Sequence, residues 1–192
     1  MWNIFAMRTM PKFLNRTLIS LIPKCQSPKT LANYRPINLC NLVYKIVTKI
    51  IIGRIQPLFN NLVSPLQAAF VTGRRGLDNI LIAQELRHSI DDKKGKEGYI
   101  AVKVDLEKAY DSLEWNFIHK ILQSHHFPNY LINLIMSCLS STSASIMFNG
   151  GTMETFYPSW GIRQGHPLSP YFFILCMEYL GSLIEKECME RG

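Results

Sequence analysis

The chain has 192 residues, which is enough for one domain with a sizeable core and too few for two full domains. Hydrophobic residues make up 47% of it and charged residues 18%, so a wholly disordered protein is excluded. The longest apolar run, Tyr171 to Met177, is far shorter than the roughly 20 residues that cross a bilayer. The first residues also lack the apolar core of a signal peptide. We therefore expect a soluble intracellular protein that contacts no membrane, in either the nucleus or the cytoplasm.

The net charge of +7 is unevenly distributed along the chain. Residues 1–77 contain eleven Lys or Arg and no Asp or Glu, whereas residues 78–192 hold the other ten basic residues and all fourteen acidic ones. Such a surface of one sign is costly unless a polyanion lies against it, which favours a nucleic-acid partner. The alternative is a basic face that serves solubility, and the charge run alone does not decide between the two.

Five cysteines show no paired spacing of the zinc or redox type, so we expect structural thiols in a reducing compartment. The first predicted helix carries an apolar stripe from Leu39 to Ile50, and its basic residues Lys45 and Lys49 face outward. A second helix is predicted from Asp78, as its N-cap, to about Ile90. Residues 99–104 alternate between apolar and polar, which predicts a half-buried strand.

A capping box at residues 111–114 predicts a helix that starts near Trp115, and a further helix is predicted over residues 130–139. Residues 143–148 and 152–157, joined through Asn149-Gly150-Gly151, predict a β-hairpin because Asn-Gly readily adopts the positive φ of a tight turn. Ser169-Pro170 predicts the start of a last helix that ends near Glu187. This order of elements indicates a mixed α/β domain.

Two segments have the composition of functional sites. Residues 161–170 contain two glycines, two prolines, Arg163 and Gln164 ahead of a helix, which indicates a rigid loop whose backbone can approach a ligand closely. Asp105 follows the predicted strand 99–104, a stiff position that suits a metal ligand. Considered alone, an Asp after a strand is more often a turn or cap residue.

Together these segments resemble the reverse transcriptases of non-LTR (LINE-type) retrotransposons, especially the plant type. The resemblance extends from about Leu18 onward and includes four blocks in the family's order. The blocks are residues 21–24 with 33–39, residues 67–74 with 78–79, residues 105–111 (motif A) and residues 161–173 (motif B).

The resemblance implies a right-hand polymerase fold, incomplete here, made of fingers and part of the palm. Residues 1–17 would be an N-terminal extension, 18–98 the strongly basic fingers, and 99–192 a partial palm. The hairpin at about 143–157 would be inserted from the fingers. The implied activity is RNA-directed DNA polymerisation, with RNA template, DNA primer and dNTP as partners.

The resemblance also implies roles for individual residues. Asp105, helped by the Leu106 carbonyl, would bind the two Mg²⁺ ions of nucleotidyl transfer. Tyr110 would be the aromatic steric gate that rejects a ribose 2′-hydroxyl, although a purely structural core aromatic is the alternative. Asp111 we assign to the helix cap. The remaining implied contacts are to nucleotide (Lys24, Arg35, Arg163, Gln164) and to nucleic acid (Arg74, Arg75, Gly165).

Two departures from the family's pattern suggest that this chain alone is inactive. The chain contains no aromatic-Ala-Asp-Asp hairpin (motif C), which supplies further metal ligands, and we expect a truncation before it. His166 stands where the family usually has Asp, so a fixed negative charge is lost near the substrate. A non-enzymatic nucleic-acid-binding remnant is the second hypothesis. A fragment without a stable fold, because strand 99–104 keeps an unpaired edge, is the third.

Overall fold

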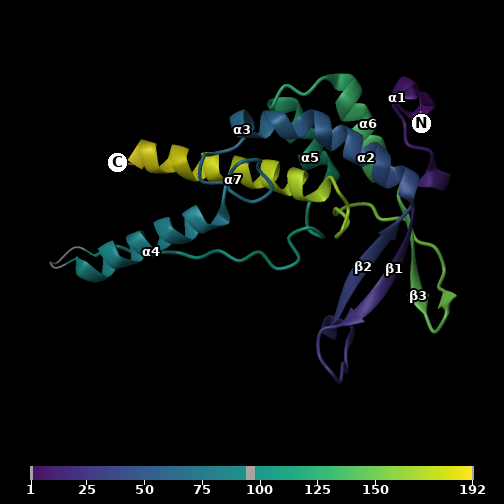
Figure 1. The fold of residues 1–192 in the computed structure, drawn as a ribbon, viewed down its shortest axis with the longest axis horizontal. Coiled ribbons are helices and arrows are strands. Elements are labelled where there is room, and N and C mark those ends of the chain that lie inside the picture. The colour runs from purple at the N-terminus through teal and green to yellow at the C-terminus, as the bar shows by residue number, and fades with distance from the viewer. Residues whose placement is uncertain (1, 94–97, 192) are drawn as a thin grey trace.

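Helices form the main body of the protein, and a sheet projects from one side of it (Figure 1). The structure is a computed structural model that describes residues 2–93 and 98–191. It confirms the predicted mixed α/β architecture. The helical elements are α1 (Trp2–Met7), η1 (Lys12–Leu14), η2 (Leu31–Asn33), α2 (Leu42–Ile55), η3 (Gln56–Leu58), α3 (Phe59–Leu62), α4 (Gly76–Asp92), α5 (Trp115–Ser124), α6 (Asn129–Ser140) and α7 (Ser169–Arg191). The strands are β1 (Arg16–Pro23), β2 (Tyr34–Cys40), β3 (Ser143–Phe148) and β4 (Gly151–Thr152).

Helix α2 begins where Asn41 caps it, because the Asn41 side chain accepts a hydrogen bond of 2.8 Å from the Val43 amide. The helix is predicted correctly, but its buried face only in part. Of the predicted stripe, Val47 is buried and Val43 half-buried, whereas Leu39, Leu42, Ile46 and Ile50 are exposed. The buried face runs through Tyr44, Val47 and Ile51, so it is rotated around the helix relative to the predicted stripe.

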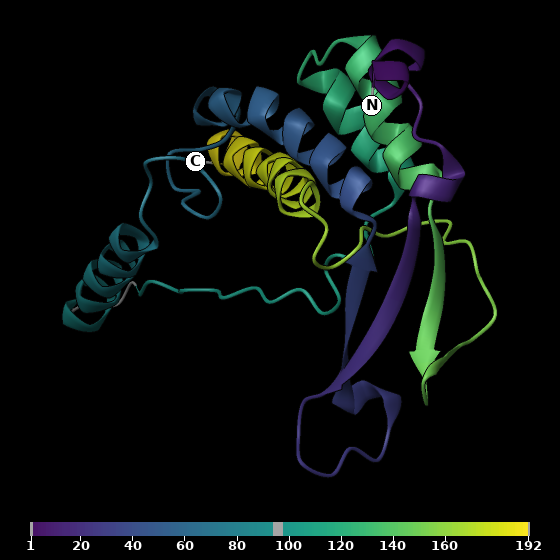
Figure 2. The same cartoon turned by 45° about the vertical axis from the view of Figure 1, so that its right-hand side comes forward.

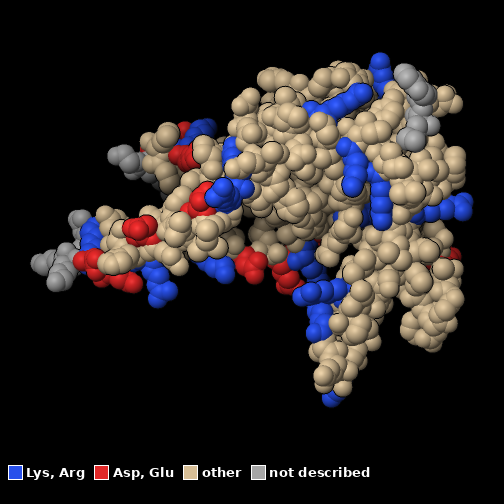
Figure 3. All heavy atoms as spheres, viewed as in Figure 1, with Lys and Arg blue, Asp and Glu red and all other residues tan. Residues whose placement is uncertain are grey.

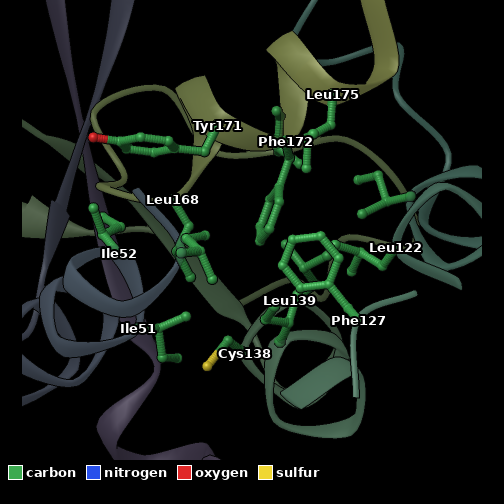
Figure 4. Packing of buried hydrophobic residues seen from close by; sticks show 14 of the residues in the cluster. Ile51, Ile52, Leu122, Phe127, Cys138, Leu139, Leu168, Tyr171, Phe172 and Leu175 are labelled. Atoms are coloured by element: carbon green, nitrogen blue, oxygen red, sulfur yellow. The ribbon is translucent and has the colours of Figure 1, made fainter. Parts of the chain in front are cut away.

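The core lies where α2, α5 and α6 meet the first half of α7. In Figure 4, Phe172 and Leu168 from the α7 end point toward Leu122 of α5 and Leu139 of α6. These side chains are almost fully buried. Figure 2 shows α2 and α7 running side by side above the sheet. Burial of this apolar surface is the main term that stabilises the helical body.

The sheet has the strand order β2-β1-β3-β4. β1 pairs antiparallel with β2, from Thr17 opposite Cys40 to Pro23 opposite Tyr34, and parallel with β3, with Arg16 opposite Ser143. The turn after β3 is the predicted one, with positive φ at Asn149 and Gly150. β4 is shorter than predicted, although an isolated bridge between Ala144 and Phe156 extends the pairing. The hairpin thus shares one sheet with β1 and β2.

The predicted strand over residues 99–104 is wrong. Residues 98–106 are extended but form no strand, and Ile100, Val102 and Val104 are 90%, 79% and 71% exposed. A strand needs a hydrogen-bonded neighbour, and within residues 2–93 and 98–191 none pairs with this segment. The alternating sequence is typical of a strand, but no other segment of the described chain pairs with it.

Two predicted helix caps are also wrong. α4 begins at Gly76 with Arg75 at its N-cap, so Asp78 lies in the first turn instead. α5 is preceded by Glu114, and no side chain caps it. Asp111 is therefore not the helix cap; its amide donates to the Lys108 carbonyl at 2.9 Å within a turn. In the described part of the chain, no helix is both long and apolar enough to cross a membrane.

Helix α4 lies apart from the core helices (Figure 1), and none of its side chains is buried. This contrast predicts unequal effects of the same substitution. Leu139→Ala in α6 should lower the free energy of unfolding by about 2–5 kcal/mol, because it leaves a cavity in the core. Leu86→Ala in α4 should cost less than about 0.5 kcal/mol. Urea denaturation of both variants measures the difference, and equal costs would contradict the described packing.

Candidate functional site

The loop of residues 161–170 lies against the end of the motif A segment. The Ile162 amide donates to the Tyr110 carbonyl at 2.8 Å, and the Gly161 amide donates to the Leu113 carbonyl at 2.8 Å. Gly161 has a φ of +80°, and a Cβ there would lie only 3.0 Å from the Asp111 carbonyl oxygen. Only glycine fits this close approach without strain. The two segments that the sequence singled out are thus joined through their backbones.

A cavity of about 860 Å³ opens where these segments meet α2. Tyr110 and Gln164, two of the expected nucleotide-binding residues, both line it. The full lining is Lys49, Ile52, Gly53, Gln56, Phe70, Tyr110, Gln164, Gly165, His166, Pro167, Ser169, Pro170 and Tyr171. The cavity therefore takes its walls from the amino-terminal part of the chain, from Tyr110 of motif A and from motif B.

Tyr110 lies between the hydrophobic core and the cavity. Its ring stacks on Phe173 with centroids 5.2 Å apart, and burial raises the pKa of its hydroxyl. The side chain packs against the core and also lines the cavity. The core packing agrees with the structural alternative, and the position at the cavity leaves the steric-gate role as a prediction.

Lys49, Gln56 and Phe70 line the cavity although the sequence did not predict it. Lys49 is exposed on α2, and the predicted basic side of that helix was the signal that could have identified it. Gln56 donates to the Thr72 hydroxyl at 2.9 Å, which ties α2 to the loop that carries Phe70. Phe70 has a positive φ of 59°, which local sequence does not predict.

Arg163 does not line this cavity; its guanidinium is directed into the protein. It donates to the Thr17 hydroxyl at 2.6 Å, to Asn15 Oδ1 at 2.8 Å and to the Tyr44 hydroxyl. The guanidinium carbon also lies 4.5 Å from the centre of the Tyr44 ring. The Arg163 side chain thus makes its contacts within the fold, and a contact with nucleotide or template stays a prediction.

Arg74 is also bound by its own chain. Its guanidinium donates to the backbone carbonyls of Ser64, Gln67, Asn60 and Val63. These carbonyls include two at the end of α3, where unpaired carbonyl groups attract a cation. Arg75 is exposed at the start of α4.

Lys24 and Arg35 lie near the far end of the β1–β2 hairpin. The Lys24 ammonium donates to the Ala32 carbonyl at 2.9 Å, and Arg35 is exposed opposite Ile22. Gly165 is exposed with a φ of +80°, next to Gln164. Figure 3 shows basic side chains over the α1–α2 side and along the hairpin, whereas acidic ones gather over α4 and the segment that follows it.

Asp105 and Leu106 are exposed in the extended segment, and neither lines the cavity. Among the described residues, no group of three or more His, Cys, Asp or Glu is placed to hold a metal ion. A single exposed carboxylate and a backbone carbonyl do not fit a two-metal centre, which needs further oxygen ligands. The described residues thus do not by themselves form the predicted two-metal centre.

His166 is 2% exposed, and its ring centre lies 4.9 Å from that of Tyr44. Its Nε2 is buried and has no hydrogen-bond partner among the described residues. Burial, reinforced by the nearby Arg163 guanidinium, holds the pKa of His166 well below its usual value. The imidazole is therefore neutral near pH 7, and it adds no second positive charge beside Arg163.

Comparison with known proteins identifies the family that this arrangement belongs to. The family described as reverse transcriptase (RNA-dependent DNA polymerase) matches residues 22–191, so the chain belongs to this family. This membership agrees with a polymerase-like fold.

Relatives in transposable elements support the same assignment. The chain is 26% identical over 182 residues to a transposon TX1 uncharacterized 149 kDa protein of Xenopus laevis, covering 95% of the chain and 14% of that protein. It is 29% identical over 172 residues to a Pol polyprotein of the retrotransposable element R2DM of Drosophila melanogaster, covering 89% of the chain and 16% of that protein. The chain is a reverse transcriptase domain of the non-LTR retrotransposon type and spans about one seventh of these relatives.

A third relative matches a shorter stretch. An uncharacterized mitochondrial protein of Arabidopsis thaliana is 50% identical over 46 residues, which are 24% of this chain and 37% of that protein.

The buried neutral histidine predicts a pH dependence of stability. The unfolded chain takes up a proton on His166 near pH 6.5, whereas the folded chain does so only at lower pH. The unfolded state therefore binds more protons, and the free energy of unfolding falls as the pH drops below about 6.5. Between about pH 7.5 and 5.5 we expect His166→Phe to lose about 1 kcal/mol less than the wild type in urea denaturation.

His125 also has a lowered pKa because of burial, but it is present in both proteins, so its contribution cancels in the comparison. Identical pH profiles for the wild type and His166→Phe would show that the imidazole is not buried in the neutral form.

Proposed function

We propose that this chain holds template, primer and nucleotide for RNA-directed DNA synthesis, as the fingers and first part of the palm of a non-LTR reverse transcriptase. The observation that carries the proposal is the cavity at which Tyr110 of motif A and Gln164 of motif B meet. Family membership supports it. The short match to the Arabidopsis protein supports the finer proposal of a plant-type element.

The geometry supports separate tasks for the cavity residues. The Tyr110 ring, stacked on Phe173, is held in place and is suited to exclude a 2′-hydroxyl by contact. Gln164 and Gly165 would contact the nucleotide or template through a side-chain amide and a closely approaching backbone. Lys49, which lines the same cavity from α2, is exposed and can neutralise a phosphate.

The basic residues outside the cavity divide into two groups. Lys24, Arg35 and Arg75 are exposed, so we propose that they contact triphosphate or nucleic acid. The Arg74 guanidinium is occupied by four carbonyls, so we propose that it fixes the loop before α4 instead. Arg74 would then affect nucleic-acid binding through the position of Phe70 rather than by direct contact.

Metal-dependent chemistry requires more than the described residues bring together. Reverse transcriptases use divalent metal ions, and we propose Asp105 as one ligand with the Leu106 carbonyl beside it. A further carboxylate has to lie next to Asp105. The backbone of residues 99–104, which pairs with no strand in the described part of the chain, is where a neighbouring strand would bring it. The contribution of the described residues is therefore binding and orientation, and we propose that the 192-residue chain does not extend a primer by itself.

Primer extension tests this proposal. A labelled DNA primer annealed to an RNA template is incubated with the chain, Mg²⁺ and dNTPs, and we expect no extension above background. The Asp105→Ala variant is the matched control, since it removes the one proposed carboxylate ligand. Robust extension that is lost in Asp105→Ala would overturn the proposed inactivity and would establish Asp105 as a catalytic ligand.

A second candidate function is nucleic-acid binding without catalysis. The observation that favours it is the eleven basic residues and no acidic residue over positions 1–77, several of which lie together on the face in Figure 3. Such binding is driven mainly by release of counterions from the phosphates.

The salt dependence of RNA binding tests whether basic side chains contact phosphates, which both candidate functions require. Affinity for single-stranded RNA should fall linearly on a log–log plot against salt, with a slope of about 0.7 per phosphate contact. Lys49→Gln should reduce the slope by about that amount, because one phosphate contact is lost. Lys186→Gln is the control, since Lys186 is exposed near Glu190 on α7 and outside the cavity. Binding that is absent or indifferent to salt would exclude both functions.

A further inference from the structure

The side chain of Arg163 is surrounded by acceptors from distant parts of the sequence. Besides Asn15, Thr17 and the Tyr44 hydroxyl, its guanidinium lies 3.5 Å from the Cys138 carbonyl and 3.8 Å from Cys40 Sγ. The acceptors belong to the segment before β1, to β1, to the end of β2, to α2 and to α6. One side chain therefore links the sheet and the helical body to the motif B loop.

The backbone carbonyl of Arg163 also forms hydrogen bonds within the loop. Its carbonyl accepts from the Ser169 hydroxyl at 2.8 Å and from the His166 amide at 3.3 Å. The next carbonyl, that of Gln164, accepts from the Asn38 side chain at 2.9 Å. The loop is thus fixed at the residue before Gln164 and at Gln164 itself.

Arg163 and the two residues that follow it face different parts of the protein. Arg163 is directed into the fold, while Gln164 and Gly165 form part of the cavity wall. An arginine suits this position because its planar fork donates to several acceptors at once and stacks on a tyrosine. A lysine carries the same charge on one compact ammonium group and cannot reproduce the paired contacts with Asn15 and Thr17.

We propose that Arg163 is a positioning residue that sets the orientation of Gln164 in the cavity and does not itself contact template or nucleotide. The proposal rests on the proposed function of the cavity, because Gln164 is assigned there as a ligand contact. Under this proposal the position of the motif B loop also depends on strands β1 and β2, since Thr17 and Asn38 both form hydrogen bonds with the loop.

A double-mutant cycle on RNA binding tests the inference. The probe is a fluorescein-labelled single-stranded oligoadenylate RNA, and the variants are Gln164→Ala, Arg163→Lys and the double variant. We expect Gln164→Ala and Arg163→Lys each to weaken binding by about tenfold, and the double variant to be no weaker than either one, because both act through the same amide. Additive losses would overturn the proposal.

The salt dependence separates positioning from direct contact. Arg163→Met should weaken binding while leaving the log–log slope against salt unchanged. Loss of a direct phosphate contact would reduce that slope by about 0.7, and this result would overturn the proposal. Arg87→Met in α4 is the matched control, because Arg87 is exposed near Asp91 and far from these contacts in the sequence.

Hydrogen exchange provides a readout that does not depend on ligand. Arg163→Met should speed deuterium uptake by the amides of residues 161–166 and leave that of α4 unchanged; equal uptake in the loop would overturn the inference. If Arg163→Met does not fold, Tyr44→Phe and Thr17→Val, which each remove one acceptor, should give the same directional changes. If the wild type binds no RNA, the proposed function fails, and hydrogen exchange still decides whether Arg163 holds the loop.

Discussion

The half-buried guanidinium of Arg163 is the interaction on which the arrangement of this protein depends. A charged group removed from water is costly unless its hydrogen bonds are satisfied, and here the partners are neutral. Burial keeps the pKa of Tyr44 well above its usual value and raises that of the Cys138 thiol to about 12, so neither neighbour ionises to balance the charge. The Arg163 guanidinium is stabilised by the dipoles of neutral hydroxyl, amide and carbonyl groups rather than by a carboxylate.

This requirement explains why the interior contains so many polar side chains. Asn15, Thr17 and Thr142 are buried within or beside an otherwise apolar core. Asn15 donates to the Cys138 carbonyl at 2.8 Å and to the Ser141 hydroxyl at 2.7 Å while its oxygen faces the guanidinium. Each side chain satisfies another buried group, so the network is worth more as a unit than its separate bonds suggest.

The same network positions the walls of the candidate cavity. Because β1, α2 and α6 converge on one residue of the motif B loop, the loop is fixed relative to α2, and the space between them becomes a cavity with defined walls. The segment with Asp105 has no comparable support: it is exposed and without strand partners among the described residues. Gln164 and Tyr110, proposed to contact substrate, are therefore positioned by the described fold, while Asp105, the proposed metal ligand, is not.

The sequence by itself determined the family, most helices and the β3–β4 turn, because these depend on local spacing: blocks in a fixed order, apolar residues at helical intervals, and an Asn-Gly pair that tolerates positive φ. It also singled out Gln164 and Tyr110, which do line the cavity. Only the tertiary structure decided which face of α2 is buried, that no described strand pairs with residues 99–104, and that Arg163 is directed inward while Lys49 is not. These outcomes depend on partners far away in the chain, such as Asn15 and Thr17 for Arg163, and local sequence carries no record of which distant groups will supply them.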